Sequence, residues 1–323
     1  MNIKSLLLGS AAALAAVSGA QAADAIIAAE PEPMEYVRVC DAFGTGYFYI
    51  PGTETCLKIG GYVRFQVSVG EDLQGGSSWD AFTRGRLEVT SKSDTELGEL
   101  TGFIAIHGDA GDQFAANDAF YMDEVYLQLG GFKAGRYLNW WDKGINGETD
   151  ILGGSRQNSI AYIYTGDAFT AGIQLDEIER VNNELGLEAI VTASLGAASV
   201  DILGGYDFDL EEGAVRALVS AQVGPGTLQL AGIWASGENY YYDNAEWTIA
   251  GSYAFKASER FTITPGAQYF DNIDFAGGDG WRAGLTVDYA VTQGMAVKVT
   301  ANYNDFDGDD EFWTGFVRLQ RNF

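Results

Sequence analysis

Hydrophobic and polar residues alternate along most of this chain. Between Leu57 and Val69 the odd-numbered positions are apolar apart from a glycine, whereas the even-numbered positions include Lys58 and Arg64. A period of two residues is that of a β-strand, whose successive side chains point to opposite faces. A register shift of one residue would move Lys58 and Arg64 to the apolar face, so the pairing of this strand is well specified.

The alternation recurs in further segments, and sixteen strands are predicted in all. They are residues 57–69, 81–93, 99–107, 119–129, 131–138, 158–165, 168–176, 187–195, 198–207, 213–223, 226–236, 246–256, 260–270, 280–290, 295–304 and 311–323. Polar side chains lie opposite the apolar face on strand after strand, which is typical of a transmembrane barrel with lipid outside and water inside. Aromatic residues near strand ends fit girdles at the membrane interfaces: Trp247, Phe255, Phe261, Tyr269, Trp281 and Tyr289. The alternative is a soluble all-β protein with aromatic residues in its core.

The connections between these strands alternate in length. Short turns are expected at residues 94–98, 130–131, 166–167, 224–226 and 257–259, and longer acidic loops at 70–80, 108–118, 177–186, 208–212, 237–245, 271–279 and 305–310. An even number of strands with short turns on one side is the arrangement of outer-membrane barrels. Residues 57–323 are therefore predicted to form an all-β, 16-stranded antiparallel transmembrane β-barrel.

One connection is longer than the others. Residues 139–157 span about nineteen positions, and a loop of this length in a compact protein is usually functional. Trp140 and Trp141 give this loop apolar surface that can pack against a wall. Its acidic side chains would then point into the space that the loop borders: Asp142, Glu148 and Asp150.

The N-terminal segment has the pattern of a secretory signal peptide. Lys4 precedes an apolar stretch, and residues 20–22 read Ala-Gln-Ala, a small-residue cleavage site. Residues 1–22 are thus predicted to be removed, and residues 23–56 to form an N-terminal leader. No later apolar run approaches the roughly 18 residues of a spanning helix, so an exported chain of this kind would enter a membrane as strands.

The leader contains the two cysteines of the chain, Cys40 and Cys56. Outside the cytoplasm, oxidising conditions favour a disulfide between them. Closing a loop of about 16 residues stabilises a fold by roughly 3 kcal/mol in the chain-entropy model. The alternative is two separate buried thiols, whereas a zinc site would need further ligands.

Charge and histidine content exclude several functions. The chain has 45 acidic against 19 basic residues and a net charge of −26, so it lacks the basic surface that nucleic acid requires. His107 is the single histidine, which leaves little for a catalytic triad or a histidine metal site. We expect no enzymatic activity, no cofactor and no metal site. A barrel hydrolase would have to depend on His107.

The chain resembles the general porins of the outer membrane, and more specifically the alphaproteobacterial porin family. The resemblance is carried by Glu-Tyr-Val-Arg-Val-Cys-Asp-Ala at 35–42, Tyr-Phe-Tyr-Ile-Pro-Gly-Thr-Glu-Thr-Cys-Leu at 47–57 and Gly-Gly-Tyr-Val-Arg at 60–64, and by the terminal Phe323. It implies a homotrimer of water-filled barrels in the cell outer membrane, among lipid and lipopolysaccharide, with the long loop folded inside as a constriction. It also implies recognition of the C-terminal strand by the barrel-assembly machinery. Arg321 departs from the family pattern, which has an apolar or aromatic outward residue there.

Closing such a barrel brings its first two strands beside its last three. Their inward positions carry a basic arc: Arg64, Arg84, Arg86, Arg282, Lys298 and Arg318. With the loop acids opposite, this arc would produce a transverse field and a pore for passive diffusion of small hydrophilic solutes and ions, with a weak cation preference. Two alternatives stay open: the basic residues are ordinary lumen residues paired with Glu88, Glu124 and Asp288, or the barrel is a substrate-specific channel with saturable transport.

Overall fold

The computed structural model describes residues 38–74, 76–110, 120–180 and 182–323, and Val39–Phe323 form one compact unit. Its strands are β1 Phe48–Tyr49, β2 Cys56–Gln74, β3 Ser77–Thr95, β4 Gly98–Ala110, β5 Phe120–Leu129, β6 Phe132–Leu138, β7 Arg156–Thr165, β8 Phe169–Glu179, β9 Asn183–Leu195, β10 Ala198–Asp207, β11 Glu212–Val223, β12 Gly226–Ala235, β13 Ala245–Lys256, β14 Phe261–Ile273, β15 Asp279–Thr292, β16 Met295–Phe306 and β17 Phe312–Asn322. The predicted signal peptide at residues 1–22 lies outside the described residues.

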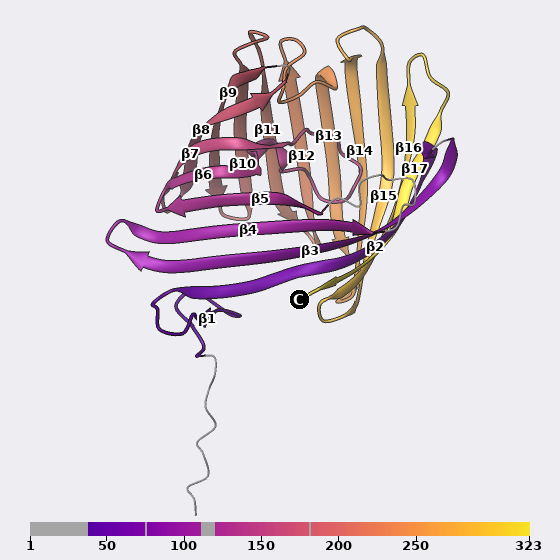
Figure 1. Ribbon diagram of the computed structural model, residues 1–323. Helices are drawn as coiled ribbons and strands as arrows, with labels where there is room; N and C mark the ends of the chain where they lie inside the picture. Colours follow the sequence, from indigo (N-terminus) through magenta and orange to yellow (C-terminus); the bar gives the residue numbers. More distant parts are fainter. Residues whose placement is uncertain (1–37, 75, 111–119, 181) are drawn as a thin grey trace, which may run out of the picture. The chain divides into compact units, whose positions relative to one another are not determined.

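Strands β2–β17 form a closed antiparallel ring (Figure 1). Each strand pairs with its neighbours in sequence, and β17 pairs with β2, so the predicted 16-stranded barrel is confirmed. In the part of the chain that the structure describes, no helix is long and apolar enough to cross a membrane.

Several strands continue into stretches that the sequence predicts as loops. β2 reaches Gln74 and β3 begins at Ser77, so most of 70–80 is strand rather than loop. The same holds for 177–186, where only residues 180–182 separate β8 from β9. In these extensions the side chains need not alternate between apolar and polar, so the sequence pattern fades, but backbone hydrogen bonds still extend the sheet.

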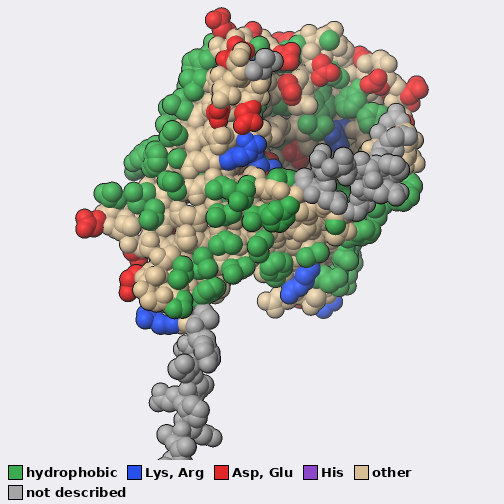
Figure 2. Space-filling view, viewed as in Figure 1, with side chains coloured by type: hydrophobic (Ala, Val, Ile, Leu, Met, Phe, Trp, Pro, Cys, Tyr) green, Lys and Arg blue, Asp and Glu red, His purple; other side chains and the backbone are tan. Residues whose placement is uncertain are grey.

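The outer face of the barrel is apolar (Figure 2). Large hydrophobic side chains at alternate positions are exposed there, among them Ile173, Leu230 and Val317. Of the aromatic residues predicted at strand ends, Trp247, Phe255, Phe261, Tyr269 and Trp281 are exposed, and Tyr289 stacks on Phe261 with ring centroids 4.5 Å apart. Exposure of this much apolar surface fits a barrel surrounded by lipid.

The seam between β17 and β2 closes the ring. Phe323 N–H donates to the Gly61 carbonyl at 3.1 Å, and Gly61 N–H donates to the Phe323 carbonyl at 3.2 Å. Gly61 has a φ of 147°, and a Cβ at this position would lie 2.0 Å from the Arg86 carbonyl oxygen. Only glycine fits here. Arg321, opposite Val63 in the register, is exposed near the end of the seam.

The N-terminal hairpin attaches to the end of β2 that extends past β17. β1 pairs with Cys56 and Leu57, and Val39 forms an isolated bridge to Phe48. A disulfide joins Cys40 to Cys56, with the two Cα atoms 6.0 Å apart, and both side chains are buried. The predicted disulfide is therefore present, and the alternative of two separate thiols is wrong.

The interior of the barrel is not polar all the way round. On β10–β14 the inward side chains include Leu203, Leu218, Ile233 and Phe270, which form the main buried apolar cluster of the described residues. The loops at residues 139–155 and 236–244 supply the aromatic side chains that cover them. The sequence analysis predicted that the long loop packs against a wall but did not predict a second loop there, and the general pattern of polar side chains inside the barrel does not hold for this part of the wall.

Candidate functional site

The loop that joins β6 to β7 begins with a short 3-10 helix, η2 Trp140–Asp142, fixed to the inner wall. The guanidinium of Arg216, on β11, donates to the Trp141 carbonyl at 2.7 Å and to the Trp140 carbonyl at 2.8 Å. Trp140 N–H donates to a carboxyl oxygen of Glu188, on β9, at 3.2 Å. These bonds satisfy the polar groups of a turn that packs its Trp141 ring into the apolar cluster.

A second loop, residues 236–244, packs on the first. The rings of Trp141 and Tyr241 lie with centroids 6.1 Å apart, and Tyr241 Oη donates to Asp176 Oδ2 at 2.8 Å. Tyr240 Oη lies 2.8 Å from Ser155 Oγ at the far end of the first loop. Sequence reasoning missed this contact; the available signal was a run of three tyrosines in a loop where only polar residues are expected.

Polar side chains on the wall hold the rest of the first loop. Their bonds to loop backbone atoms are Asn146 N to Gln229 Oε1 at 2.6 Å, Glu148 N to Thr286 Oγ1 at 2.9 Å, Ile151 N to Gln268 Oε1 at 2.6 Å, and Asn302 Nδ2 to Glu148 O at 3.0 Å. These wall residues come from β12, β14, β15 and β16. The loop therefore follows one side of the lumen. Its described residues make no hydrogen bond or ion pair to β2–β5, and they reach β17 through the contact between Glu148 and Arg318, so we call the side formed by β2–β5 and β17 the uncovered side.

The three loop acids have different surroundings. Glu148 Oε1 lies 2.6 Å from Lys298 Nζ and 3.7 Å from Arg318 Nη1. Asp150 accepts a hydrogen bond from Ile145 N–H at 3.2 Å, but burial prevails and raises its pKa to about 6. Burial also raises the pKa of Asp142. All three, with Asp243 of the second loop, line a hollow of about 760 Å³.

The basic residues of the predicted arc fall into two groups. Arg84 is paired with Asp109 through two bonds of 2.6 and 2.7 Å. Arg86 contacts three carboxylates, those of Glu88 at 2.6 Å, Glu124 at 2.9 Å and Asp123. The alternative in which the basic residues are ordinary lumen residues paired with nearby carboxylates therefore describes the contacts of Arg86.

The remaining basic residues lie nearer the loop or have neutral partners. Lys298 contacts Asp288 at 3.6 Å in addition to Glu148. Arg64 donates through Nε to Gln320 at 2.8 Å, and Arg282 has no ion pair among the described residues.

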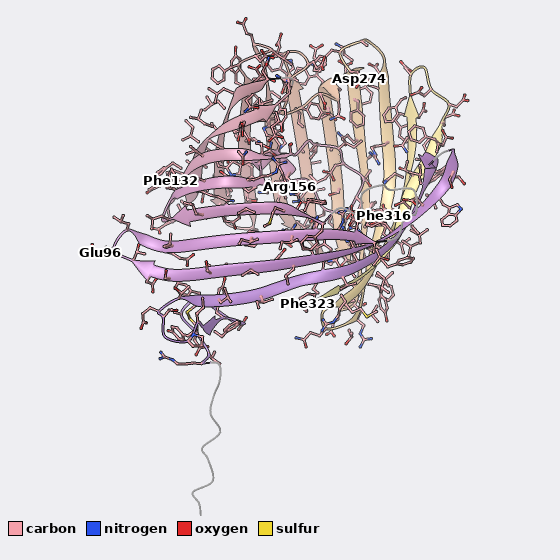
Figure 3. The ribbon with its side chains drawn as sticks, in the orientation of Figure 1. Glu96, Phe132, Arg156, Asp274, Phe316 and Phe323 are labelled. Atoms are coloured by element: carbon pink, nitrogen blue, oxygen red, sulfur yellow. A yellow bond between two sulfur atoms is a disulfide. The ribbon has the colours of Figure 1, made fainter. Side chains whose placement is uncertain are left out.

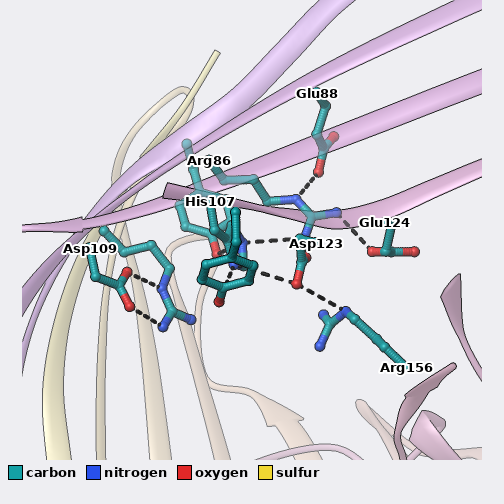
Figure 4. Close-up of polar contacts among 10 residues, drawn as sticks. Arg86, Glu88, His107, Asp109, Asp123, Glu124 and Arg156 are labelled. Atoms are coloured by element: carbon teal, nitrogen blue, oxygen red, sulfur yellow. Dashed lines mark hydrogen bonds and ion pairs between the residues drawn. The ribbon is translucent and has the colours of Figure 1, made fainter. Parts of the chain in front are cut away.

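His107 lies in the paired group (Figure 4). Its Nε2 is 3.3 Å from both Tyr62 Oη and Arg86 Nη1, and its Nδ1 is 3.2 Å from Tyr121 Oη. Arg156, which sequence reasoning missed, extends from β7 to within 3.2 Å of Asp123. Asp123 is thus shared between Arg86 and Arg156 and lies 3.6 Å from His107 Nδ1, while His107 also contacts two tyrosine hydroxyls and a guanidinium.

Comparison with known proteins identifies the family of this barrel. The model of the porin subfamily matches residues 24–320. The chain is 46% identical to outer membrane protein IIIA of Rhizobium leguminosarum bv. viciae, with 96% of this chain and 92% of that protein covered. It is 35% identical to porin Omp2b of Brucella neotomae over the full length of both, and 55% identical to the outer membrane protein y4fJ of Sinorhizobium fredii, covering 100% of this chain and 99% of that protein.

Solved porin structures share the fold at low sequence identity. The outer membrane channel DcaP of Acinetobacter baumannii is 15% identical, with a TM-score of 0.66 over 85% of this chain and 99% of that one. A mutant of the Rh. blastica porin is also 15% identical, with a TM-score of 0.60 over 83% of this chain and all of that one. The chain therefore belongs to the porin family of the alphaproteobacteria and forms a channel across the outer membrane.

Proposed function

We propose that the loop at residues 139–155 is the constriction of this porin and gives it a weak cation preference. The observation that carries the proposal is the position of Glu148, whose carboxylate lies between the loop and the basic side chains of Lys298 and Arg318. Asp142 and Asp150 line the same hollow as Glu148. Fixed charges of opposite sign across a narrow aqueous passage order its water and bias which ions pass.

The charge outside the constriction supports the same preference. The chain carries a net charge of −26, and acidic side chains lie along the upper rim in Figure 2. An acidic entrance raises the local concentration of cations. Small hydrophilic solutes and ions would then diffuse passively, with cations modestly favoured over anions.

A homotrimer is part of the proposal. β6 has only 7 residues, whereas a strand that spans lipid by itself needs about 9–11. The outer wall at β6 is thus too short to face the hydrocarbon core alone, and it carries Arg136 beside Phe132, so cover by a neighbouring subunit solves this. Conductance steps that occur in groups of three would support the trimer, and steps that only occur singly would contradict it.

The proposal also includes the route to the membrane. Residues 1–22 act as a signal peptide, so N-terminal sequencing of the purified barrel should begin near Ala23. The C-terminal strand with Phe323 is the segment that the assembly machinery recognises before the barrel meets lipid and lipopolysaccharide. Phe323→Ala should lower the yield of barrel inserted in cells, and an unchanged yield would contradict this role.

The central experiment is planar-bilayer conductance of the detergent-folded protein under a KCl gradient. We compare the wild type with an Asp142→Asn, Glu148→Gln, Asp150→Asn variant. The expected result is a reversal potential that moves toward anion preference in the variant, because three negative charges leave the constriction.

The matched control removes the same charge from positions in or next to the short turns through Asp94→Asn, Asp167→Asn and Glu259→Gln. We expect its reversal potential to stay close to that of the wild type. Equal shifts in both variants would show that net charge, and not the loop, sets selectivity.

A further inference from the structure

Two arginines on the side of the lumen formed by β2 and β17 donate hydrogen bonds to neutral glutamine side chains across the seam. Arg64, on β2, donates through Nε to Gln320 Oε1, on β17, at 2.8 Å. Arg318, on β17, donates through Nε to Gln66 Oε1, on β2, at 2.7 Å. Each arginine is directly opposite its glutamine in the register, so the two strands exchange the same pair of bonds. Among the described residues neither Nη atom of Arg64 has a hydrogen-bond or ion-pair partner, whereas Nη1 of Arg318 lies 3.7 Å from Glu148 Oε1 and its Nη2 has no such partner.

Each of these guanidinium groups also lies over an aromatic ring two positions earlier in its own strand. The Arg64 guanidinium is 4.6 Å from the centroid of the Tyr62 ring, and that of Arg318 is 4.2 Å from the centroid of the Phe316 ring. Figure 3 labels Phe316 where β17 and β2 lie side by side. A guanidinium this close to a ring centroid is attracted by the ring, and an arginine can in addition stack a second flat group on its other face.

The nearby carboxylates are occupied by other cations. Glu148 lies 3.7 Å from Arg318 but only 2.6 Å from Lys298. Asp109 is held by both bonds from Arg84, which itself lies over the Phe82 ring. Among the described residues no carboxylate lies within ion-pair distance of Arg64. Two like charges on adjacent strands oppose each other, and an anion from solution would relieve this cost.

We propose that Arg64 and Arg318 form a binding site for small organic carboxylates that carry a planar ring. The inference rests on the proposed diffusion channel and names a class of solute that this part of its wall would retain. The Nη groups present paired donors to a carboxylate, the geometry in which arginine binds it most strongly. The open guanidinium face adds contact with a flat ring, which a small aliphatic acid lacks.

The test uses benzoate as the probe on single channels in KCl at pH 7. Benzoate should lower or interrupt the current of the wild type, because a bound solute occupies the passage. The concentration for half of this effect should rise about tenfold in Arg64→Gln, which loses a charge-assisted pair of hydrogen bonds. It should also rise in Arg318→Gln, which loses a positive charge and an Nη2 donor beside the same site. Arg260→Gln, a control that removes the same charge from an exposed turn, should behave as the wild type.

Neutral and aliphatic probes separate the two parts of the proposal. Benzamide should leave the current unchanged, and an effect equal to that of benzoate would exclude carboxylate recognition. Acetate should act only at higher concentration, and equal potency would exclude a contribution from the ring. Equal responses to benzoate in wild type, both arginine variants and the control would overturn the site.

Failure of the site is distinguishable from failure of the channel. Current steps that are insensitive to benzoate would overturn only the site, whereas absence of steps in the wild type would overturn the proposed diffusion function. If a glutamine variant forms no channels, Arg64→Lys replaces it in the test, because lysine keeps the positive charge but lacks the planar guanidinium with its paired donors. Benzoate potency in Arg64→Lys should fall below that of the wild type, and unchanged potency would overturn the role of the paired donors.

Discussion

The two sides of the lumen are built on different physical principles. On β10–β14 the inner wall carries an apolar cluster that two loops cover, with Trp141, Tyr241 and Leu218 fully buried. On β2–β5 and β17, as far as the structure describes them, the inner wall carries arginines that are paired with carboxylates or glutamines. Burial of apolar surface, assisted by hydrogen bonds such as those of Arg216, holds the first side, whereas charge-assisted hydrogen bonds dominate the second.

This difference separates two properties of the channel. In the proposed channel, the packing on the covered side fixes how far the loop at residues 139–155 extends into the lumen, and so the width of the passage. The basic residues of the uncovered side, together with the loop acids, determine which charges a solute meets. Substitutions in the apolar packing of the covered side should therefore change conductance, whereas substitutions of charged residues on the uncovered side should change selectivity at nearly constant conductance.

The largest effect is expected from Trp141→Ala. The Trp141 ring is fully buried between the wall and Tyr241, and its removal should cost about 3–5 kcal/mol of the energy that holds the loop in place. The loop should then detach for part of the time, and single-channel conductance should rise with added current noise. Bilayer recordings together with the urea midpoint of unfolding measure both effects.

The matched control is Trp313→Ala, whose side chain is 61% exposed on the outer face. It should leave conductance unchanged. A Trp141→Ala channel with the conductance and noise of the wild type would show that the polar bonds to the loop suffice, and the distinction between the two sides would fail.

A smaller effect is expected from Arg86→Gln on the uncovered side. This change leaves Asp123 buried with Arg156 as its remaining cation, at a cost of about 2 kcal/mol. Loss of a positive charge from the lumen should increase cation preference, with conductance close to that of the wild type. The reversal potential in a KCl gradient is the measurement, and Arg260→Gln is the control. A large change in conductance would contradict the division of roles.

The smallest effect is expected from pH, through Asp150. Burial raises its pKa to about 6, whereas ordinary aspartates titrate near 3.9. Lowering the pH from 7 to 5 should therefore protonate Asp150 while most other carboxylates stay charged, and cation preference should fall across this range. The reversal potential of Asp150→Asn should lack this step. A step that persists in the variant would assign the titration to another group.

The sequence predicts the barrel well because lipid imposes one rule on every strand. The alternation from Leu57 onward follows from apolar side chains facing outward, and all sixteen strands appear where it predicts them. The alternation distinguishes inside from outside, but it does not show what fills the inside. Leu218 and Ile233 are inward, apolar and covered by loops, and no local pattern links them to Trp141 or Tyr241.

For the candidate site, the sequence predicts which residues take part better than it predicts how they are paired. The loop acids and the basic arc could be named, because loop length and strand parity identify them. Their pairing could be predicted only in part, since it depends on which strands become neighbours and on how the loop runs. The contacts of Arg86 with Glu88 and Glu124 and of Lys298 with Asp288 agree with one of the alternatives read from the sequence. The role of Asp123 between Arg86 and Arg156 was missed, because these partners are far apart along the chain.

The seam between β2 and β17 also has a consequence for folding kinetics. The bond from Arg64 to Gln320 joins positions 256 residues apart, so forming it requires closing almost the whole chain into one loop. Contacts of such long range form slowly. Until they form, β2 and β17 are free edges that can pair with another chain. Refolding yield should therefore depend on dilution, because intramolecular closure competes with association at these two edges.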